Sequence, residues 1–207
     1  RYTVYRHDRD RLLTGKNDGG GCLIAVKRKY CSVRITEWEL EQEDVWVSLD
    51  QLDGGKVFFN VRYVPCRSAF DVYNVHLSKI NELVNVIKPN GNFVLAGDYN
   101  LADTIKWVAG PDGTCEACDV VGNVAESLVD LLSLTGLSQF NTKLNGNGRT
   151  LDLILSNLDP GRLIVDVDDD SIIRKDVHHP PVSFQLDVSP LRFLDENRPP
   201  KRNFFRA

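Results

Sequence analysis

The chain has 207 residues, of which 42% are hydrophobic and 26% are charged, and its formal net charge is −4. This length and composition predict one large domain with a substantial core. No apolar run approaches the ~20 residues of a membrane-spanning helix, so we expect a protein without membrane association. The negative charge argues against a protein that coats nucleic acid, although an enzyme that touches a short stretch of DNA needs only a local basic rim.

Five scattered cysteines do not form the disulfide framework of a secreted domain, so we expect an intracellular protein. Cys115 and Cys118 have the spacing of half a zinc site, but no second pair completes it, and an exposed loop is the favoured interpretation. The chain begins with Arg1 and contains no Met, from which we expect a segment of a longer polypeptide.

In chain order, the first third of the sequence predicts antiparallel strands. Runs rich in β-branched and aromatic residues alternate with glycine-rich turns, and Asp53-Gly54-Gly55 is typical of a hairpin. The acidic residues Glu37, Glu39, Glu41 and Glu43 between two such runs are expected to form a solvated edge. The expected strands are residues 2–6, 22–26, 45–49 and 56–63.

The middle of the chain predicts two amphipathic helices around a buried strand. Ser68 and Asp71 resemble a capping box before apolar residues spaced by three and four, and Pro89 and Gly91 close that helix. The nearly wholly apolar run 92–96 is typical of a strand that is buried on both faces. A second helix is expected over residues 124–134, and further strands over 138–142, 151–155 and 182–186.

Many strands with few helices predict an α+β protein in which two packed, mostly antiparallel sheets carry helices on their outer faces, a four-layer α/β sandwich. From Ser189 onward, prolines alternate with basic residues, which favours a linker. We therefore expect a domain over residues 1–188 and a linker over residues 189–207.

Three segments carry residues suited to chemistry. Asp98 and Asn100 follow the apolar strand and, two residues apart on an extended segment, project to the same side. Asp152 interrupts an apolar strand, where a carboxylate needs a partner such as a His or a metal. His178 and His179 follow Asp176 near the end of the expected domain, and a His beside an acid can transfer protons or hold a phosphate oxygen. Each segment alone is also compatible with an ordinary turn or strand.

In this order and spacing, the three segments resemble the endonuclease/exonuclease/phosphatase superfamily, whose hallmarks are Gly-Asp-aromatic-Asn, Leu-Asp, and a terminal Asp-His-x-Pro. The features between them, including Tyr63-Val64-Pro65 and Trp107, are similar to the nucleases of Jockey-type non-LTR retrotransposons. The tail 201–206 is similar to the segment that leads towards their reverse transcriptase.

The resemblance implies an endonuclease that nicks DNA with Mg²⁺ or Mn²⁺, works in the nucleus and shares a polyprotein with a reverse transcriptase. Asp98 would deprotonate the attacking water, Asn100 would bind a phosphoryl oxygen, and His179, held by Asp152, would contact the scissile phosphate beside Tyr63. The family pattern places Pro two residues and an aliphatic residue three residues after the catalytic His. His179 satisfies both with Pro181 and Val182, whereas His178 would place Pro181 where the aliphatic residue belongs. Arg67, Asn141 and the loop 145–149 are predicted to face DNA.

Two departures from the family pattern limit this expectation. His178 stands where the family has Asp, so Asp176 is the nearest carboxylate and becomes the predicted metal ligand. The family's first strands carry an Asn and the main metal-binding Glu, and no segment of this chain matches them, so we expect an N-terminally truncated domain with little nuclease activity by itself. The alternatives are a superfamily phosphatase or RNase with another phosphate ester as substrate, and an inactive copy that serves at most as a binding module.

Overall fold

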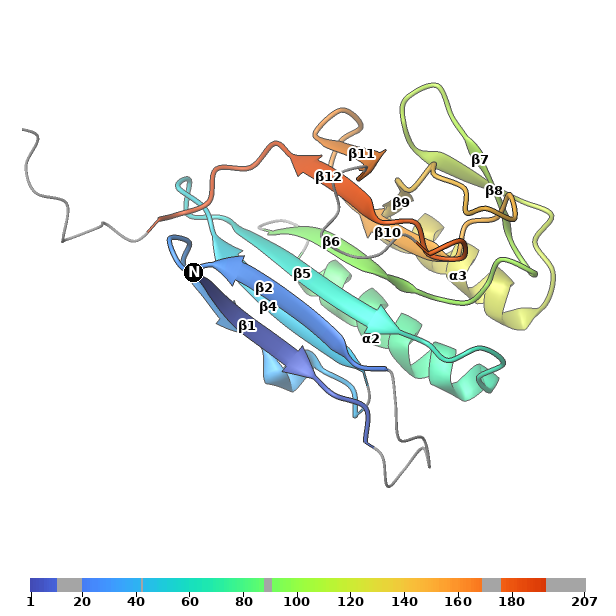
Figure 1. The fold of residues 1–207 in the computed structure, drawn as a ribbon, viewed down its shortest axis with the longest axis horizontal. Helices are drawn as coiled ribbons and strands as arrows, with labels where there is room; N and C mark the ends of the chain where they lie inside the picture. Colours follow the sequence, from blue (N-terminus) through green and yellow to red (C-terminus); the bar gives the residue numbers. More distant parts are fainter. Residues whose placement is uncertain (11–19, 42, 88–90, 169–175, 193–207) are drawn as a thin grey trace, which may run out of the picture.

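The computed structural model describes residues 1–10, 20–41, 43–87, 91–168 and 176–192. Strands in these ranges form one eight-stranded sheet and two separate two-stranded sheets, and two α-helices pack beside the large sheet (Figure 1). Neither of these helices is both long and apolar enough to cross a membrane. The α+β class and the largely antiparallel pairing expected from the sequence are confirmed.

The large sheet has the strand order β3-β4-β5-β6-β10-β9-β8-β7. Neighbouring strands are antiparallel except for β5 and β6, which run parallel. The strands in chain order are β3 (Ser32–Arg34), β4 (Asp44–Asp50), β5 (Lys56–Tyr63), β6 (Gly91–Asp98), β7 (Lys106–Ala109), β8 (Cys115–Cys118), β9 (Ser138–Gln139) and β10 (Asp152–Ser156).

The two helices cover one face of this sheet. Helix α2 (Phe70–Ile87) connects the parallel strands β5 and β6, since a parallel pair requires a crossover. Helix α3 (Asn123–Thr135) lies beside it and ends at Gly136, whose φ of 68° allows the left-handed cap. The largest core cluster lies beneath both helices and includes Ile80, Phe93 and Leu128. As expected, β6 is buried on both faces over its central residues.

Two hairpins cover the opposite face of the sheet (Figure 1). The hairpin of β1 (Tyr2–His7) and β2 (Cys22–Lys27) packs on β4 through apolar side chains that include Val26 and Val45. The hairpin of β11 (Leu163–Val167) and β12 (Val182–Leu186) packs on β5, β6 and β10 through a cluster of apolar side chains that includes Val94 of β6. The chain is therefore layered as helices, large sheet and hairpins.

Several local expectations differ from the structure. Cys115 and Cys118 lie in β8, paired with β7, and Cys115 is buried, so the expected exposed loop is wrong. The strand expected over residues 138–142 ends at Gln139, although the Phe140 amide still donates to the Ile154 carbonyl of β10. The Gln139 side chain accepts a hydrogen bond from the Asn141 amide. Gly91, which was expected to close the first helix, begins β6.

The expected solvated edge of glutamates is correct for Glu37 and Glu41, which are exposed, but wrong for Glu39 and Glu43. Glu43 is only 1% exposed, and its carboxylate accepts hydrogen bonds from the Arg9 guanidinium at 3.0 Å and from the Gly21 amide at 2.7 Å. Glu39 pairs with Arg34 at 2.8 Å. A buried carboxylate is tolerated when a charged partner and backbone donors satisfy it.

The segment that follows residue 188 begins as part of the domain. The backbone amide of Leu52 bonds to Ser189, and the amide of Cys31 bonds to Leu191. Gln51 and Pro190 form an isolated β-bridge. The folded part therefore extends to Arg192, whereas the rest of the predicted linker, residues 193–207, lies outside the described residues.

Candidate active site

The three segments whose residues suit chemistry meet at one end of the central strands of the large sheet. Tyr63 is the last residue of β5, and Asp98 is the last residue of the parallel strand β6, so their register places them side by side. Asp152 is the first residue of β10, which runs antiparallel to β6, and it pairs directly with Asp98. Strand register alone thus gathers Tyr63, Asp98 and Asp152 from three distant parts of the chain.

Asp98 and Asn100 form a tight polar turn. The Asn100 amide donates to Asp98 Oδ1 at 2.9 Å, and Asn100 Nδ2 donates to Asp98 Oδ2 at 2.8 Å and to the Val64 carbonyl at 2.9 Å. Asn100 has a φ of 50°, a left-handed conformation that Asn tolerates better than most residues. The backbone and side-chain amides of Asn100 therefore hold both oxygens of the Asp98 carboxylate, whose side chain is 12% exposed.

Tyr99, between these two residues, points into the core and anchors the turn. Its ring is fully buried, its hydroxyl lies 3.0 Å from His76 Nε2, and its carbonyl accepts the Tyr73 hydroxyl at 2.8 Å. Burial, reinforced by the charge of Arg62, lowers the pKa of His76 well below its ordinary value, so this imidazole is neutral. Sequence reasoning missed Tyr73 and His76, which appear in the sequence only as members of an amphipathic helix.

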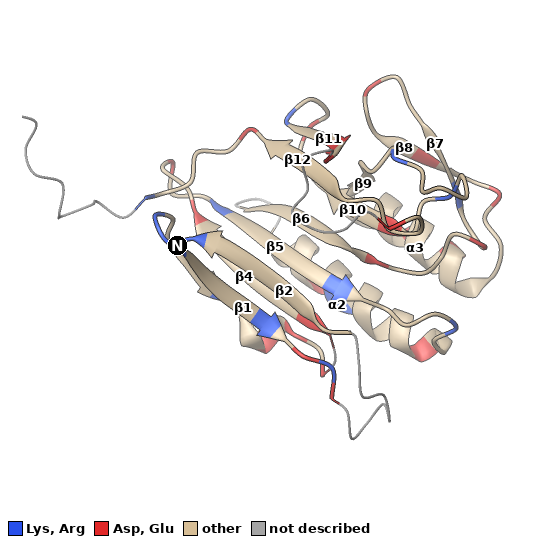
Figure 2. Cartoon of the chain, in the orientation of Figure 1, with Lys and Arg blue, Asp and Glu red and all other residues tan. Residues whose placement is uncertain are grey.

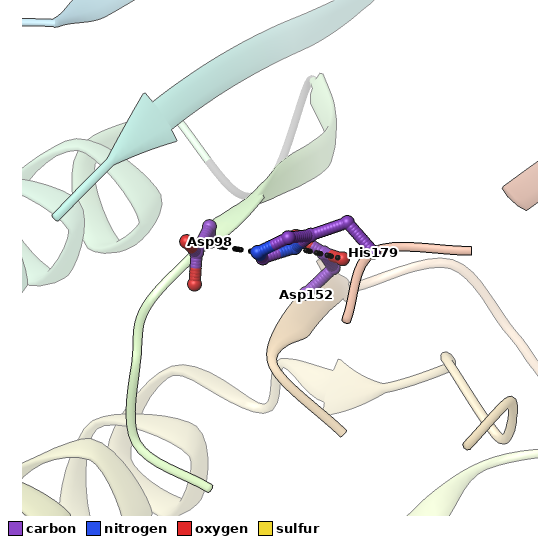
Figure 3. Close-up of side chains that lie close together, drawn as sticks. All are labelled: Asp98, Asp152 and His179. Atoms are coloured by element: carbon purple, nitrogen blue, oxygen red, sulfur yellow. Dashed lines mark hydrogen bonds and ion pairs between the residues drawn. The ribbon is translucent and has the colours of Figure 1, made fainter. Parts of the chain in front are cut away.

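His179 closes the site by contacting both carboxylates. Its Nδ1 lies 3.0 and 3.2 Å from the two oxygens of Asp152, and its Nε2 lies 3.8 Å from Asp98 Oδ2 (Figure 3). Because an ionised carboxylate only accepts, Nδ1 carries the proton in this contact and Nε2 faces Asp98. Of the two adjacent histidines, the structure brings His179 to Asp152, as the sequence pattern predicted.

The electrostatics couple these groups. Burial is the main cause that raises the pKa of Asp98, and the charge of Asp152 adds to it, while Asn100 and His179 oppose the shift. Burial disfavours the charged form of His179, but its hydrogen bond to Asp152 and the charges of Asp152 and Asp98 outweigh burial and raise its pKa. Both shifts favour the retention of a proton in the contact between the imidazole and the carboxylates.

Tyr63 is flanked by a buried ion pair that sequence reasoning did not predict. The guanidinium of Arg9 lies 5.3 Å from the centre of the Tyr63 ring and is held by Glu43. The Tyr63 amide donates to the Glu43 carbonyl at 3.1 Å. Glu43 adopts a φ of 48°. The ion pair thus connects the β1–β2 hairpin to the end of β5 beside Asp98.

The other predicted site residues lie around this centre. Asn141 is only 2% exposed, and its Nδ2 donates to the Asp152 carbonyl at 2.7 Å, so its amide supports the start of β10. Arg67 is exposed after β5 with a φ of 61°. Asp176 is exposed and accepts the His178 amide at 2.7 Å. The structure does not bring Asp176 together with Asp98 and Asp152.

Among the described residues, one group offers a metal ion three or more ligand atoms from His, Cys, Asp or Glu. It consists of Asp98, Asp152 and His179, whose ligand atoms lie within 4.8 Å of one another. Two carboxylates suit Mg²⁺ or Mn²⁺, which take oxygen ligands and complete their coordination with water or substrate. Basic and acidic residues are interspersed along most of the described chain, and a short basic run, Lys27-Arg28-Lys29, lies at the end of β2 (Figure 2).

No protein-family model matches the chain, and no curated protein matches it by sequence. Among solved structures, the endonuclease domain of TRAS1, a telomere-specific non-LTR retrotransposon, is similar over 89% of this chain and 80% of that domain, with a TM-score of 0.55 and 16% sequence identity. The chain has the fold of this endonuclease domain. The fold implied by the sequence resemblance is thereby confirmed.

Two further structures align over similar lengths. The human Nocturnin catalytic domain aligns with 89% of this chain and 72% of its own, at 14% identity and a TM-score of 0.48. An endonuclease/exonuclease/phosphatase family protein from Leptotrichia buccalis aligns with 91% of this chain and 72% of its own, at 16% identity and a TM-score of 0.46. At sequence identities of 14% to 16%, the similarity shows the fold alone, and the function is argued from the residues of the site.

Proposed function

We propose that the chain is a metal-dependent phosphodiesterase domain that nicks DNA. The observation that carries the proposal is the contact of one imidazole with two carboxylates at the end of β6 and β10: His179 touches Asp152 and faces Asp98. Hydrolysis of a phosphodiester requires a proton acceptor for water and hydrogen-bond donors for the phosphoryl oxygens. These three residues with Asn100 and Tyr63 supply both.

Each residue has a distinct role in this proposal. Asp98, whose Oδ2 lies 3.8 Å from His179 Nε2, orients the attacking water and accepts its proton. Asn100, whose Nδ2 donates to Asp98 and to the Val64 carbonyl, exchanges one of these hydrogen bonds for one to a phosphoryl oxygen, and Tyr63 lies beside the phosphate. His179 donates a hydrogen bond to the scissile phosphate while Asp152 holds its ring in one orientation, a division of labour common in acid–base sites.

Mg²⁺ or Mn²⁺, when bound through the carboxylate oxygens of Asp98 and Asp152, supplies positive charge to the phosphoryl oxygens. Both carboxylates already make contacts in the described chain, Asp98 with Asn100 and Asp152 with His179. We therefore expect weak metal binding and slow nicking that requires high metal concentrations. Asp176 stays a predicted additional ligand, and Arg67 stays a predicted DNA contact. Asn141 is buried against the start of β10, which does not favour the DNA contact predicted for it.

The likeness to a retrotransposon endonuclease domain supports DNA as the substrate. With this substrate, the proposal includes a reverse transcriptase domain in the same polypeptide and action in the nucleus. The linker towards that domain would lie within residues 193–207, after a domain that reaches Arg192.

Nicking of supercoiled plasmid in Mg²⁺ or Mn²⁺ tests the proposal. We expect relaxed circles that disappear with chelator and with Asp98→Ala, and 3′ ends that a polymerase extends directly. Inositol phosphates and single-stranded RNA serve as competing substrates in the same assay. Preferential hydrolysis of either, or nicking that survives Asp98→Ala, contradicts the proposal.

A further inference from the structure

The loop of residues 145–149 lies between the two segments that form the imidazole–carboxylate contact. It precedes β10, so Arg149, Thr150 and Leu151 lead directly into Asp152. On its other side, the loop contacts residues 177 and 178, next to His179. Although the sequence predicted that this loop faces DNA, Asn145 at its start is only 6% exposed.

Asn145 closes the loop on itself. Its Oδ1 accepts hydrogen bonds from the Asn147 amide at 2.9 Å and from the Arg149 amide at 3.0 Å. The Asn145 amide donates to the Arg149 carbonyl at 2.8 Å, and Gly148, with a φ of 71°, makes the reversal. The backbone of this loop is consequently rigid relative to the first residues of β10.

The same loop holds the segment before His179 at three points. Asn145 Nδ2 donates to the His178 carbonyl at 3.2 Å, and the Gly146 amide donates to the Val177 carbonyl at 2.8 Å. Asn147 Nδ2 lies 3.2 Å from His178 Nδ1. Gly146 allows this approach, because a Cβ there would lie 2.7 Å from Val177 Cγ1.

This attachment matters because, within the part of the chain that the structure describes, His179 has little other support. Its side chain is 43% exposed, and Val177 is 63% exposed. Asp176 caps the His178 amide from within the same segment, which does not tie the segment to the sheet. The next backbone bond between this segment and another is Asp168 to Pro181, on the far side of His179.

We propose that Asn145 is a positioning residue, which fixes the His178 backbone so that the His179 imidazole stays against Asp152. The inference rests on the proposed function. The Asn145 side chain thereby connects both partners of the contact to one loop. Its Oδ1 holds the backbone that leads into Asp152, and its Nδ2 holds the backbone that leads into His179. A loosened imidazole samples both tautomers and both ring orientations, which slows chemistry without weakening substrate binding.

The test compares Asn145→Asp with Asn157→Asp. Asn145→Asp keeps the Oδ1 acceptor and removes the donor to His178. Asn157 makes the matched pair of bonds at the opposite end of β10: its Oδ1 accepts the Phe93 amide at 2.7 Å, and its Nδ2 donates to the Gly91 carbonyl at 3.1 Å. Both substitutions therefore remove one hydrogen-bond donor and add one negative charge, but only Asn145→Asp lies beside the site.

For Asn145→Asp we expect kcat for nicking to fall by up to ~100-fold, the scale of a small misplacement of a catalytic group, with KM unchanged within about twofold. Asn157→Asp should leave both constants near those of the unsubstituted chain. Asn145→Ala, which adds no charge, should reproduce the loss in kcat. Equal kcat values for the two Asp variants, or a rise in KM alone, overturn the proposal.

A second readout is independent of activity. In the ¹⁵N NMR spectrum of the imidazoles, we expect His179 to show a proton on Nδ1 in the unsubstituted chain and in Asn157→Asp, and averaged tautomers in Asn145→Asp and Asn145→Ala. A fixed Nδ1 tautomer in the folded Asn145 variants refutes the positioning role even if no substrate is cleaved. Averaged tautomers in a chain without nicking activity support positioning and count against the proposed function alone.

Discussion

The two ends of the β6–β10 pair are built from the same two strands and differ in what their polar groups face. At one end, Ser156 and Asn157 bond to the backbone of Phe93 and Gly91, and Ser156 is fully buried. At the other end, Asp98 and Asp152 face each other and a half-exposed imidazole. Polar groups that satisfy the backbone stabilise a fold, whereas groups left facing one another and solvent are available for chemistry.

The largest expected effect comes from removing the imidazole at the chemical end. His179→Gln should lower the rate of nicking by at least ~100-fold, because positioned acid–base groups typically contribute that much or more. Its free energy of unfolding should change little, since the ring is 43% exposed. The measurements are plasmid nicking and urea denaturation.

The control for this change is His7→Gln on β1, where the imidazole contacts the Asp44 carbonyl at 3.0 Å. This variant should nick at the unsubstituted rate. A similar loss of nicking in both variants would mean that the loss does not depend on the place of His179 beside Asp98 and Asp152.

The second prediction extends the comparison to the buried ion pair beside Tyr63. Arg9→Met leaves the Glu43 carboxylate buried without its charged partner, which typically costs ~3–5 kcal/mol of unfolding free energy. Arg162→Met breaks the pair with Asp187, whose side chain is 83% exposed, and should cost about 1 kcal/mol or less. Urea denaturation of both variants measures the difference, and equal losses would show that Glu43 is not buried as described.

The sequence could predict the chemical end because its information is local. Apolar runs fixed β5, β6 and β10, and the order of three short segments implied that Asp98, Asp152 and His179 belong to one site. The juxtaposition of Asp98 and Asp152 then follows from strand register. The sequence also allowed a choice between His178 and His179 through the position of Pro181.

The remaining features could not be predicted because they depend on distant partners. Glu43 looks like one of four exposed glutamates until Arg9, 34 residues earlier, is folded over it. The strands β7 and β8 are four residues long and lack alternation, so Cys115 and Cys118 resembled a loop. Asn145 resembled any polar turn residue, and its role depends on a carbonyl 33 residues away.

The third prediction concerns pH. Asp152 raises the pKa of His179, so the protonated imidazole stabilises the fold below its ordinary pKa near 6.5, and this contribution is lost as pH rises through the raised value. Asp152→Asn removes the cause, and the pKa of His179 should fall. The alkaline limb of the nicking profile should move to lower pH with it.

NMR titration of the His179 ring measures this shift directly. Asp187→Asn, an exposed substitution after β12, is the control and should leave the titration unchanged. A His179 pKa that stays in place in Asp152→Asn would show that burial and Asp98 govern the imidazole, and that Asp152 only orients it.

The last prediction has the smallest expected effect and compares the two ends of β6 directly. Two substitutions each remove one buried hydroxyl beside one end of this strand. The Tyr73 hydroxyl donates to the Tyr99 carbonyl at 2.8 Å beside the site, and the Ser156 hydroxyl donates to the Phe93 carbonyl at 2.6 Å at the other end. Tyr73→Phe and Ser156→Ala should each cost about 1 kcal/mol of unfolding free energy. Only Tyr73→Phe should also slow nicking, by a few-fold, since Tyr99 lies between Asp98 and Asn100 and its carbonyl fixes their turn. If both variants slow nicking equally, the rate follows stability rather than the geometry of that turn, and the two ends of the strand are functionally equivalent.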